Sequence, residues 1–480
     1  MSAAASSTVV ESHSIDVIPE SEREGRVWHL APFWFAANQQ FLTVVTGVLG
    51  VVLGLNLFWA IVAIVVGNLV GTVFMAYHSA QGPILGVTQM IQSRGQFGFY
   101  GAFFLFVAAF FLQFGFYASA TALSGEALNA LSPHLSVPVG IAIVSVPTLV
   151  LAILGYRWLH VWQRWSSIVL FVVFAIVTAL AVDHAVKNGL PAGALSSAAP
   201  DWGAFLVVVS VAATYAIVWA PFVSDYSRYL PRTSGVGACF GWTYLGTVVS
   251  CIWLEVLGSL VAVLFPKLET AQALGSLAGS WLLVVLALSM IGAATTNLYS
   301  GMVALATAAS TWWTPRRSTL VRVVGVGITF VVGFVIAIAG YSSFLENFVN
   351  FLLVLAFLFI PWTAVNLADF YLVRHGRYDP QAFFTPRGIY GGWIWQALVA
   401  YFIGLILQVP FIDQAFYVGP LVPLVGGADI SWIIGIIVPG LLYVTLARIW
   451  APAGAVEPRP SLSQLPPSEG SPVTATGGSA

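Results

Sequence analysis

Long apolar stretches recur along this chain and are separated by short polar segments. A helix needs about 20 mostly apolar residues to cross a hydrocarbon core of roughly 30 Å. Twelve stretches meet this condition, at residues 33–54, 57–77, 99–131, 137–155, 165–182, 204–224, 241–265, 281–308, 321–340, 346–373, 393–411 and 431–449. Because only 7% of the residues are charged, against roughly a quarter in soluble domains, polar groups could not cover a water-exposed surface. We therefore predict an all-α polytopic membrane protein.

The basic residues orient these spans in the membrane. Lysine and arginine concentrate in short cytoplasmic loops of membrane proteins. If the N-terminus is cytoplasmic, then of the 17 basic residues only Lys187 and Lys267 fall on the outer side. One span more or fewer in the middle of the chain would scramble this partition. We expect about twelve spans in the inner (plasma) membrane, both termini in the cytoplasm, and a short outer helix between residues 266 and 280.

Both ends of the chain differ from the apolar region between them. Residues 1–30 are polar and contain no apolar core that could form a signal peptide. Residues 451–480 are rich in Pro, Ser, Gly and Ala, a composition that cannot bury enough apolar surface to fold. We expect two mostly disordered cytoplasmic tails that take no part in the chemistry.

Polar side chains at mid-depth are the informative residues of a membrane protein, because each needs a partner or a water-filled cavity. The first span contains Asn38, Gln39 and Gln40 in succession. Three successive residues of a helix point about 100° apart, so one packed face cannot hide them all. We predict a cavity or a break in the helix here. The alternative is that the amides hydrogen-bond neighbouring helices.

Three other spans contain polar groups at a similar depth. Tyr215 lies in the sixth span, upstream of Pro221, which removes a backbone hydrogen bond. Asn297 is preceded by two threonines in the eighth span, and Gln113 and Tyr117 lie four residues apart on one helical face of the third. These residues are candidates for ligand contacts. The alternatives are a tolerated kink, an interhelical hydrogen bond and aromatic packing.

Acidic residues inside the spans are few. Glu255 lies well inside the seventh span. Since desolvation disfavours the charged form of a carboxyl, Glu255 is a candidate proton carrier, and the alternative is a hydrogen bond that holds helices together. Asp225 and Asp369 fall at predicted cytoplasmic helix ends near Arg228 and Arg374, where we expect them to fix loops.

The sequence lacks the common motifs of nucleotide-binding proteins and hydrolytic enzymes. It contains no phosphate-binding loop with lysine, no HExxH pair and no Gly-x-Ser-x-Gly turn. The two cysteines are too few for a cysteine-based zinc cluster, and a net charge of -1 gives no general attraction for nucleic acid. We expect no enzymatic activity, no cofactor, no metal site and no nucleic-acid partner.

Five motifs occur in order along the predicted spans. They are Phe33-Trp34-Phe35-Ala36-Ala37-Asn38, Gly67-Asn68, Ser224-Asp225-Tyr226-Ser227-Arg228-Tyr229, Asn297-Leu298-Tyr299-Ser300 and Asp369-Phe370-Tyr371-Leu372-Val373-Arg374. In their order and in the spans that contain them, these motifs resemble the purine-cytosine permease group of the nucleobase:cation symporter-1 family. The likeness runs from about residue 15 to residue 450.

The resemblance implies the leucine-transporter fold, in which two inverted repeats of five spans enclose a site at mid-depth. Here the repeats would be residues 31–182 and 204–373, and residues 393–449 would form two peripheral spans. The polar breaks of spans one and six agree with this, because they lie five spans apart.

The resemblance also implies a set of substrate-binding positions between spans one, three, six and eight. They fall on Gln40, Gln113, Tyr117, Tyr215, Ala216 and Asn297. A nucleobase has two π-faces and an edge of alternating donors and acceptors, which rings can stack on and amides can read. Because this chain has Gln113 where well-studied members have tryptophan, the stacking partner must come from Tyr117, Tyr215 or a nearby phenylalanine.

A second departure concerns the coupling ion. Sodium-coupled members have adjacent hydroxyl residues in span eight, and the matching positions here are Ile291 and Gly292. Neither side chain supplies the oxygen that a hard cation prefers. Backbone carbonyls at Ala36 and Gln39 could still form part of a cation site, but we favour a proton over sodium.

These inferences predict a secondary active transporter that imports a nucleobase of cytosine or purine type, together with a proton or sodium ion, by alternating access. A transporter of the same fold for a vitamin-precursor pyrimidine, a hydantoin or allantoin is the alternative. A polytopic membrane enzyme is a further alternative, but it would need paired catalytic acids or metal ligands, which this sequence lacks.

Overall fold

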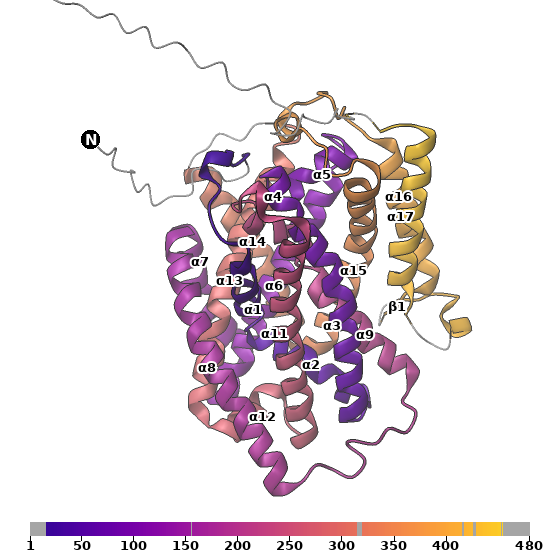
Figure 1. Cartoon of the computed structure of the whole chain (residues 1–480). Coiled ribbons are helices and arrows are strands. Elements are labelled where there is room, and N and C mark those ends of the chain that lie inside the picture. The colour runs from indigo at the N-terminus through magenta and orange to yellow at the C-terminus, as the bar shows by residue number, and fades with distance from the viewer. Residues whose placement is uncertain are drawn as a thin grey trace, which may run out of the picture.

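The chain folds into a bundle of long helices that run between two ends (Figure 1). The computed structural model describes residues 16–154, 156–313, 319–414, 417–425, 429–452 and 454. One end of the bundle is marked by the short helices α4 and α5, and the opposite end by α12 (Figure 1). These are called the α5 end and the α12 end below.

The first predicted repeat contains eight helices. They are α1 (Leu30–Ala37), α2 (Phe41–Val52), α3 (Leu57–Ser79), α4 (Gln81–Leu85), α5 (Gln89–Phe97), α6 (Phe103–Leu131), α7 (Val137–Leu154) and α8 (Tyr156–Asn188). The second repeat contains α9 (Trp202–Ile217), α10 (Ala220–Ser227), α11 (Val236–Leu264), α12 (Thr270–Ala278), α13 (Ser280–Ala309), α14 (Thr319–Gly340) and α15 (Phe344–Leu367), which continues as a π-helix over Ala368–Val373.

The remaining elements follow the second repeat or connect the long helices. Helices α16 (Trp395–Gln408) and α17 (Ser431–Ile449) pack on each other and on α15, with the small hairpin β1 (Asp413–Gln414) and β2 (Tyr417–Val418) between them. Short 3-10 helices occur at Glu20–Glu22, Val27–His29, Arg232–Ser234, Tyr341–Ser343, Pro380–Phe384, Val409–Phe411 and Val422–Val425.

Each of the twelve predicted spans coincides with an apolar helix or helix pair. In the part of the chain that the structure describes, nine helical stretches are long and apolar enough to cross a membrane, or ten if a bent pair is counted as one span. One of them, Arg322–Val373, contains two predicted spans, and Trp395–Phe411 is a shorter apolar helix. The predicted outer helix is α12.

The outer surface of the bundle explains the hydrophobic composition. Large apolar side chains on outward faces remain exposed, among them Val146 at 62%, Leu154 at 56% and Ile168 at 55%. Helices satisfy their backbone hydrogen bonds internally, so such faces are stable in hydrocarbon. Inside the bundle, glycines allow close helix contact. A Cβ added at Gly67 or Gly71 of α3 would overlap the backbone of α9.

The two predicted loop-fixing acids bind at the α5 end. Asp225 Oδ1 accepts from the backbone N–H of Gln89, the first residue of α5. The Asp369 carboxylate accepts from Arg374 Nε at 3.1 Å and from the hydroxyls of Tyr378 and Tyr443. Burial alone would lower the pKa of the Arg374 guanidinium, but the neighbouring Asp369 carboxylate raises it above its ordinary value. Both acids therefore hold the ends of helices together.

The prediction that the first 30 residues are mostly disordered is wrong for residues 16–30. Ile18 and Arg23 are 1% and 8% exposed. The Arg23 guanidinium donates to the backbone oxygen of Ile18 at 2.9 and 2.8 Å and to that of Pro83 at 2.8 Å. It fits because Gly86, at φ 67°, has no side chain to block it. Residues 1–15, 453 and 455–480 of the predicted tails lie outside the described residues.

Candidate functional site

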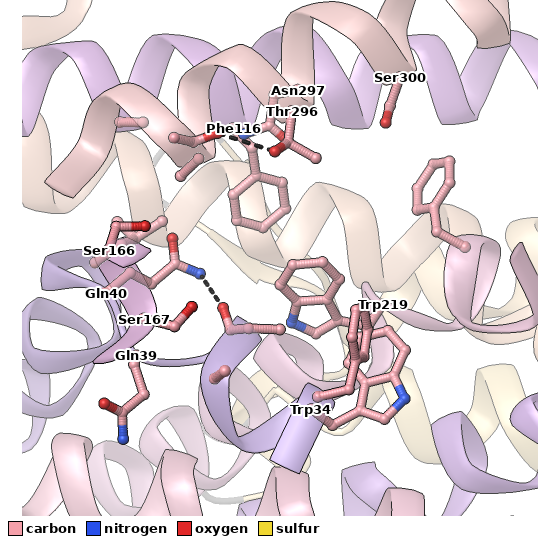
Figure 2. Close-up of a pocket in the computed structure, with 18 of the residues that line it drawn as sticks. Trp34, Gln39, Gln40, Phe116, Ser166, Ser167, Trp219, Thr296, Asn297 and Ser300 are labelled. Carbon is pink, nitrogen blue, oxygen red and sulfur yellow. Dashed lines mark hydrogen bonds between the residues drawn. The ribbon is translucent and has the colours of Figure 1, made fainter. Parts of the chain in front are cut away.

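A cavity of about 500 Å³ lies inside the bundle, where two broken helices meet three continuous ones. Its walls come from α1, α2, α6, α8, α9, α10 and α13. Most of the lining side chains are apolar or aromatic, and the polar ones converge from several helices (Figure 2). A concave, mostly apolar space with a few convergent polar groups is the usual form of a small-molecule site.

The first broken helix contains the three successive amides. Helices α1 and α2 are bent by 64° relative to each other at Asn38, Gln39 and Gln40. Gln40 is extended, with φ -147° and ψ 156°, and the Asn38 amide donates to the backbone oxygen of Trp34 at 2.8 Å. Thr43 Oγ1 donates to the Asn38 backbone oxygen at 2.7 Å. The predicted break is confirmed, and side chains replace the helical hydrogen bonds that it removes.

Two of these amides line the cavity. Gln40 Nε2 donates to the Ala37 backbone oxygen at 3.2 Å, as Figure 2 shows. Gln39 is 3% exposed, and neither of its side-chain polar atoms has a hydrogen-bond partner among the described residues. A buried amide without partners costs free energy unless a ligand or water supplies them. The break therefore presents hydrogen-bonding groups to whatever occupies the cavity.

The second broken helix is the sixth predicted span. Helix α9 ends at Ile217 and α10 begins at Ala220, with Pro221 in its first turn, where no backbone N–H is needed. Trp219, between the two helices, lines the cavity and meets Trp34 edge to face at 5.6 Å. Tyr215 also lines the cavity, and its hydroxyl bonds Thr43 Oγ1 at 2.8 Å. This bond joins the two broken spans beside the cavity.

The wall opposite the breaks is formed by α6 and α13, which pack closely together. Gln113 on α6 and Asn297 on α13 both line the cavity. Gln113 is 3% exposed, and its Oε1 has no partner among the described residues. Figure 2 shows Phe116, Gln40 and Trp219 projecting into the same space from different sides.

Comparison with known proteins identifies the fold and the family. A family model described as permease for cytosine/purines, uracil, thiamine, allantoin matches residues 17–435. The chain belongs to this family. The putative purine-cytosine permease YxlA of Bacillus subtilis is 39% identical over 447 residues, which cover 92% of this chain and 96% of the relative. The purine-cytosine permease fcyB of Emericella nidulans is 27% identical over 468 residues, covering 91% and 88%.

Solved structures of Mhp1, a nucleobase-cation-symport-1 family transporter, share the fold. An inward-facing conformation superposes with a TM-score of 0.71 at 20% identity, covering 91% of this chain and 93% of Mhp1. A closed conformation with bromovinylhydantoin bound gives a TM-score of 0.69 at 19% identity, covering 92% and 96%. The predicted family and the predicted leucine-transporter fold are confirmed. The relatives are permeases, so this permease is a multi-pass membrane transporter and not an enzyme.

Among the predicted substrate-binding residues of this permease, Tyr117 lies away from the cavity. It is fully buried, its ring centre is 6.1 Å from that of Phe330, and a Cβ at Gly333 of α14 would overlap it. Successive residues of a helix advance by 100°, so Phe116 and Tyr117 fall on opposite sides of Gln113. Helix α14 covers the Tyr117 side, which leaves Phe116 as the ring beside Gln113.

Ala216 and Glu255 also lie outside the cavity lining. Ala216 is fully buried, and its backbone oxygen accepts from the Trp219 N–H at 3.3 Å, so it shapes the break without facing the cavity. Glu255 is fully buried on α11, where Oε2 accepts from the Asn68 amide at 2.7 Å. The carboxyl is thus separate from the space that would hold the substrate.

The predicted cation positions, Ala36 and Gln39, lie at the first broken span. Ala36 and Gln39 both line the cavity, but the Ala36 backbone oxygen already accepts from the Gln39 N–H at 3.1 Å. On α13, the backbone oxygens of Ile291 and Gly292 accept the hydroxyls of Thr295 and Thr296 at 2.7 and 2.9 Å. Among the residues that the structure describes, no group of three or more His, Cys, Asp or Glu side chains could hold a metal ion.

Several lining residues are absent from the sequence-based candidates. Phe116, Trp219 and Thr296 lie within four residues of the predicted residues Gln113, Tyr215 and Asn297. An aromatic or hydroxyl side chain close to a predicted site residue is the signal that could have identified them. Ser166 and Ser167 come from α8 and have no such neighbour. Only the packing of α8 against α1 and α13 brings them to the site.

A second cavity of about 390 Å³ adjoins the first on the side of the α5 end. The two share six lining residues, Phe33, Phe222, Asp225, Tyr226, Thr296 and Ser300. Its outer walls include Glu24 and Gly25 of the N-terminal segment and Arg228 and Tyr229 after α10. The central cavity is therefore adjacent to a vestibule at the end of the bundle where the N-terminal segment packs.

Proposed function

We propose that this permease imports a nucleobase of cytosine or purine type, or a closely related planar heterocycle, by alternating access. The observation that supports this most directly is the character of the central cavity. Amides from three helices, Gln40, Gln113 and Asn297, face the same space as aromatic rings. Asp225 is the charged side chain among the lining residues that the structure describes, and it already binds α5. Such a cavity suits a neutral, flat ligand.

Aromatic rings would bind the faces of the substrate, and amides would bind its edge. Phe116 and Trp219 would cover the π-faces of the base, since base–aromatic stacking contributes about 1–3 kcal/mol per ring. The amides of Gln113 and Asn297 can each donate and accept, so they can read a heterocyclic edge. A heterocycle with a different edge would leave buried amide atoms unpaired.

The family description and the ligand of one Mhp1 structure favour a second group of substrates. The family description includes thiamine and allantoin beside cytosine, purines and uracil, and one Mhp1 structure contains bromovinylhydantoin. A vitamin-precursor pyrimidine, a hydantoin or allantoin is therefore the alternative substrate. Nucleobases and these alternative substrates all contain a small ring with several hydrogen-bonding nitrogen or oxygen atoms. Competition of uptake must therefore distinguish them.

We also propose that a proton drives the import. The two positions of α13 that would face a cation, Ile291 and Gly292, supply no side-chain oxygen, and their backbone oxygens already accept threonine hydroxyls. A hard cation with 6 or so oxygen ligands is poorly served by the remaining groups at Ala36 and Gln39. Glu255, fully buried on α11, is the proposed proton carrier.

The proposed orientation places the α5 end in the cytoplasm of the cell, across its inner (plasma) membrane, with both termini on that side. Arg23, Arg94, Arg228 and Arg374 contact residues at the α5 end, whereas Lys187 lies in the last turn of α8, a helix that packs against α12. This arrangement agrees with the enrichment of basic residues in cytoplasmic loops. Single-cysteine labelling at His184 and at Arg377, from outside intact cells, would test it: only the former should react.

The experiment that tests the function is an uptake panel with radiolabelled cytosine, adenine, hypoxanthine, allantoin and a benzylated hydantoin in proteoliposomes. Asn297→Ala should abolish saturable uptake of the best substrate while the protein remains at normal abundance. Asn347→Ala, an exposed asparagine outside the cavity, is the matched control and should leave uptake intact. Saturable uptake by Asn297→Ala equal to that of the natural chain would contradict the proposed site. Separate proton and sodium gradients would identify the coupling ion.

A further inference from the structure

A carboxyl–amide pair lies outside the substrate cavity, between helices α2, α3 and α11. Asn68 on α3 donates one amide hydrogen to Glu255 Oε2 at 2.7 Å and another to the Ile64 backbone oxygen at 3.0 Å. Both side chains are 0% exposed. The amide nitrogen is thus fully used, and the pair is closed to solvent in this conformation.

The two remaining oxygens of the pair have no partner. Glu255 Oε1 and Asn68 Oδ1 are both buried and accept no hydrogen bond among the residues that the structure describes. If Glu255 is ionised, both atoms are pure acceptors, and two acceptors cannot satisfy each other. A proton on the carboxyl supplies the missing donor, because a carboxylic acid and a primary amide can form two hydrogen bonds side by side.

Among the residues that the structure describes, no positively charged side chain compensates a charge on Glu255. The ion pairs of Lys187 with Asp183, Arg232 with Glu20 and Arg374 with Asp369 do not include Glu255. The titratable groups that face the carboxyl are the Cys251 thiol, one turn earlier on α11, and the Tyr215 hydroxyl on α9. Both are neutral at physiological pH. A buried carboxylate without a cation is costly, so protonation is the less expensive state.

The position of the pair connects it to the broken span. A Cβ at Gly47 of α2 would overlap the Glu255 backbone, and Ser259 Oγ donates to the Gly47 backbone oxygen at 2.6 Å. Helix α2 begins immediately after the break that carries Gln39 and Gln40. Through Tyr215, which bonds Thr43 of α2, the same helix also touches the cavity wall. A change at Glu255 therefore acts on the helix that frames the substrate site.

We propose that Glu255 and Asn68 together form the proton-binding site of this permease, and that Glu255 is neutral in the conformation described. The inference rests on the proposed proton coupling and adds the partner that holds the proton. In one transport cycle the Glu255 carboxylate takes one proton from the outer side. It releases that proton to the cytoplasm when α3 and α11 rearrange, which regenerates the carboxylate. Asn68 is a positioning residue, because it acts through Glu255.

The test separates net proton-driven transport from substrate exchange. Proteoliposomes with the natural chain, Glu255→Gln, Asn68→Ala and the control Ser250→Ala would be assayed in sodium-free buffer. Ser250 is a buried residue of α11 whose hydroxyl donates to the backbone oxygens of Gly246 and Thr247 in its own helix and makes no bond to Glu255 or Asn68 in the described residues. One assay measures uphill accumulation under an imposed pH gradient, and the other measures counterflow exchange, which needs no net proton movement.

Glu255→Gln should lose uphill accumulation by tenfold or more and keep exchange within about twofold. Glutamine preserves the shape and one hydrogen bond to Asn68 but cannot release a proton. Asn68→Ala should still accumulate substrate, but with its half-maximal pH shifted by about half a unit or more, because a hydrogen bond of about 1 kcal/mol is lost. Ser250→Ala should match the natural chain in both assays.

The outcomes distinguish failure of the site from failure of the proposed coupling. Accumulation by Glu255→Gln driven by the pH gradient would overturn the site, as would an Asn68→Ala profile identical to that of the natural chain. If the natural chain itself accumulates substrate only with sodium, the coupling proposal fails, and the proton site fails with it. If Glu255→Gln neither accumulates nor exchanges, the pH dependence of its substrate binding decides: a flat profile supports the site, and the natural slope overturns it.

Discussion

Replacement of Gln113 by leucine is the sharpest perturbation of the proposed substrate site. The side chain lines the central cavity, is 3% exposed, and has an Oε1 atom without a partner among the described residues. A substrate N–H that reaches this oxygen would satisfy both groups. Leucine has a similar size but no acceptor, so the N–H of the bound substrate would be buried unpaired.

The magnitude follows from the cost of an unsatisfied buried donor. That cost is about 1–3 kcal/mol. At about 1.4 kcal/mol per factor of ten, the substrate affinity should fall by about 5- to 150-fold. The loss should appear as a raised KM for uptake, with the abundance of the protein in the membrane unchanged.

The assay compares substrates as well as variants. Initial rates of uptake would be measured for the best substrate and for analogues methylated at one ring nitrogen at a time, with the natural chain and with Gln113→Leu. The analogue that lacks the N–H read by Gln113 should bind the two proteins equally. Gln396→Leu is the matched control, because this glutamine is half-buried on α16 and donates to the Trp450 backbone oxygen away from the cavity. Equal losses for every analogue, or a change in maximal rate alone, would refute the assignment of Gln113 to the substrate edge.

Three further predictions follow from the packing. Phe116→Ala should raise the KM for uptake by about 5- to 150-fold, because stacking worth about 1–3 kcal/mol is lost. Tyr117→Phe should leave uptake kinetics unchanged, since that ring faces α14. The reverse pattern would contradict the placement of both rings. Gly47→Val should reduce the amount of folded protein in the membrane, because even a Cβ at this position overlaps the backbone of α11. Gly237→Ala, at a position with open space, should not reduce it. Fluorescence-detected size-exclusion chromatography measures the abundance of each variant. Asp369→Asn should lower the free energy of unfolding by about 3–5 kcal/mol, because it leaves the Arg374 guanidinium buried without its anion. An unchanged unfolding temperature in detergent would contradict this prediction.

The hydrogen-bonding part of the site could be predicted because lipid penalises unpaired polar groups. Gln40, Gln113 and Asn297 were candidates for ligand contact from their depth in apolar spans alone, and all three line the cavity. The break between α1 and α2 was also predictable, since no single helical face can hide three successive amides.

The aromatic part was less predictable. Phe116 and Tyr117 are adjacent in the sequence, and both have apolar rings. Which of them faces the cavity depends on α14, whose Gly333 receives the Tyr117 ring and so fixes the rotation of α6. The contribution of α8 through Ser166 and Ser167 is likewise a result of helix packing, to which local sequence gives no signal.

The partner of Glu255 could not be predicted from the sequence either, because the two residues are far apart in the chain. The sequence indicated a buried carboxyl, but not that its partner would be Asn68, which is 187 residues away along the chain. The ordered structure of residues 16–30 was also not predictable, because their polar composition favours disorder. Contacts with distant residues, such as Arg23 with Pro83 and Ile18 with Gly86, offset it.

The sequence by itself determined that lipid surrounds this protein, where its apolar helices lie, which family it belongs to and which amides line its cavity. These depend on the length and polarity of each segment relative to a bilayer about 30 Å thick, which is local information. The tertiary structure alone decided which ring faces the substrate, which helix completes the cavity and which side chain shares a hydrogen bond with Glu255. Each of these depends on how helices rotate and pack, and that is set by contacts between residues far apart in the chain.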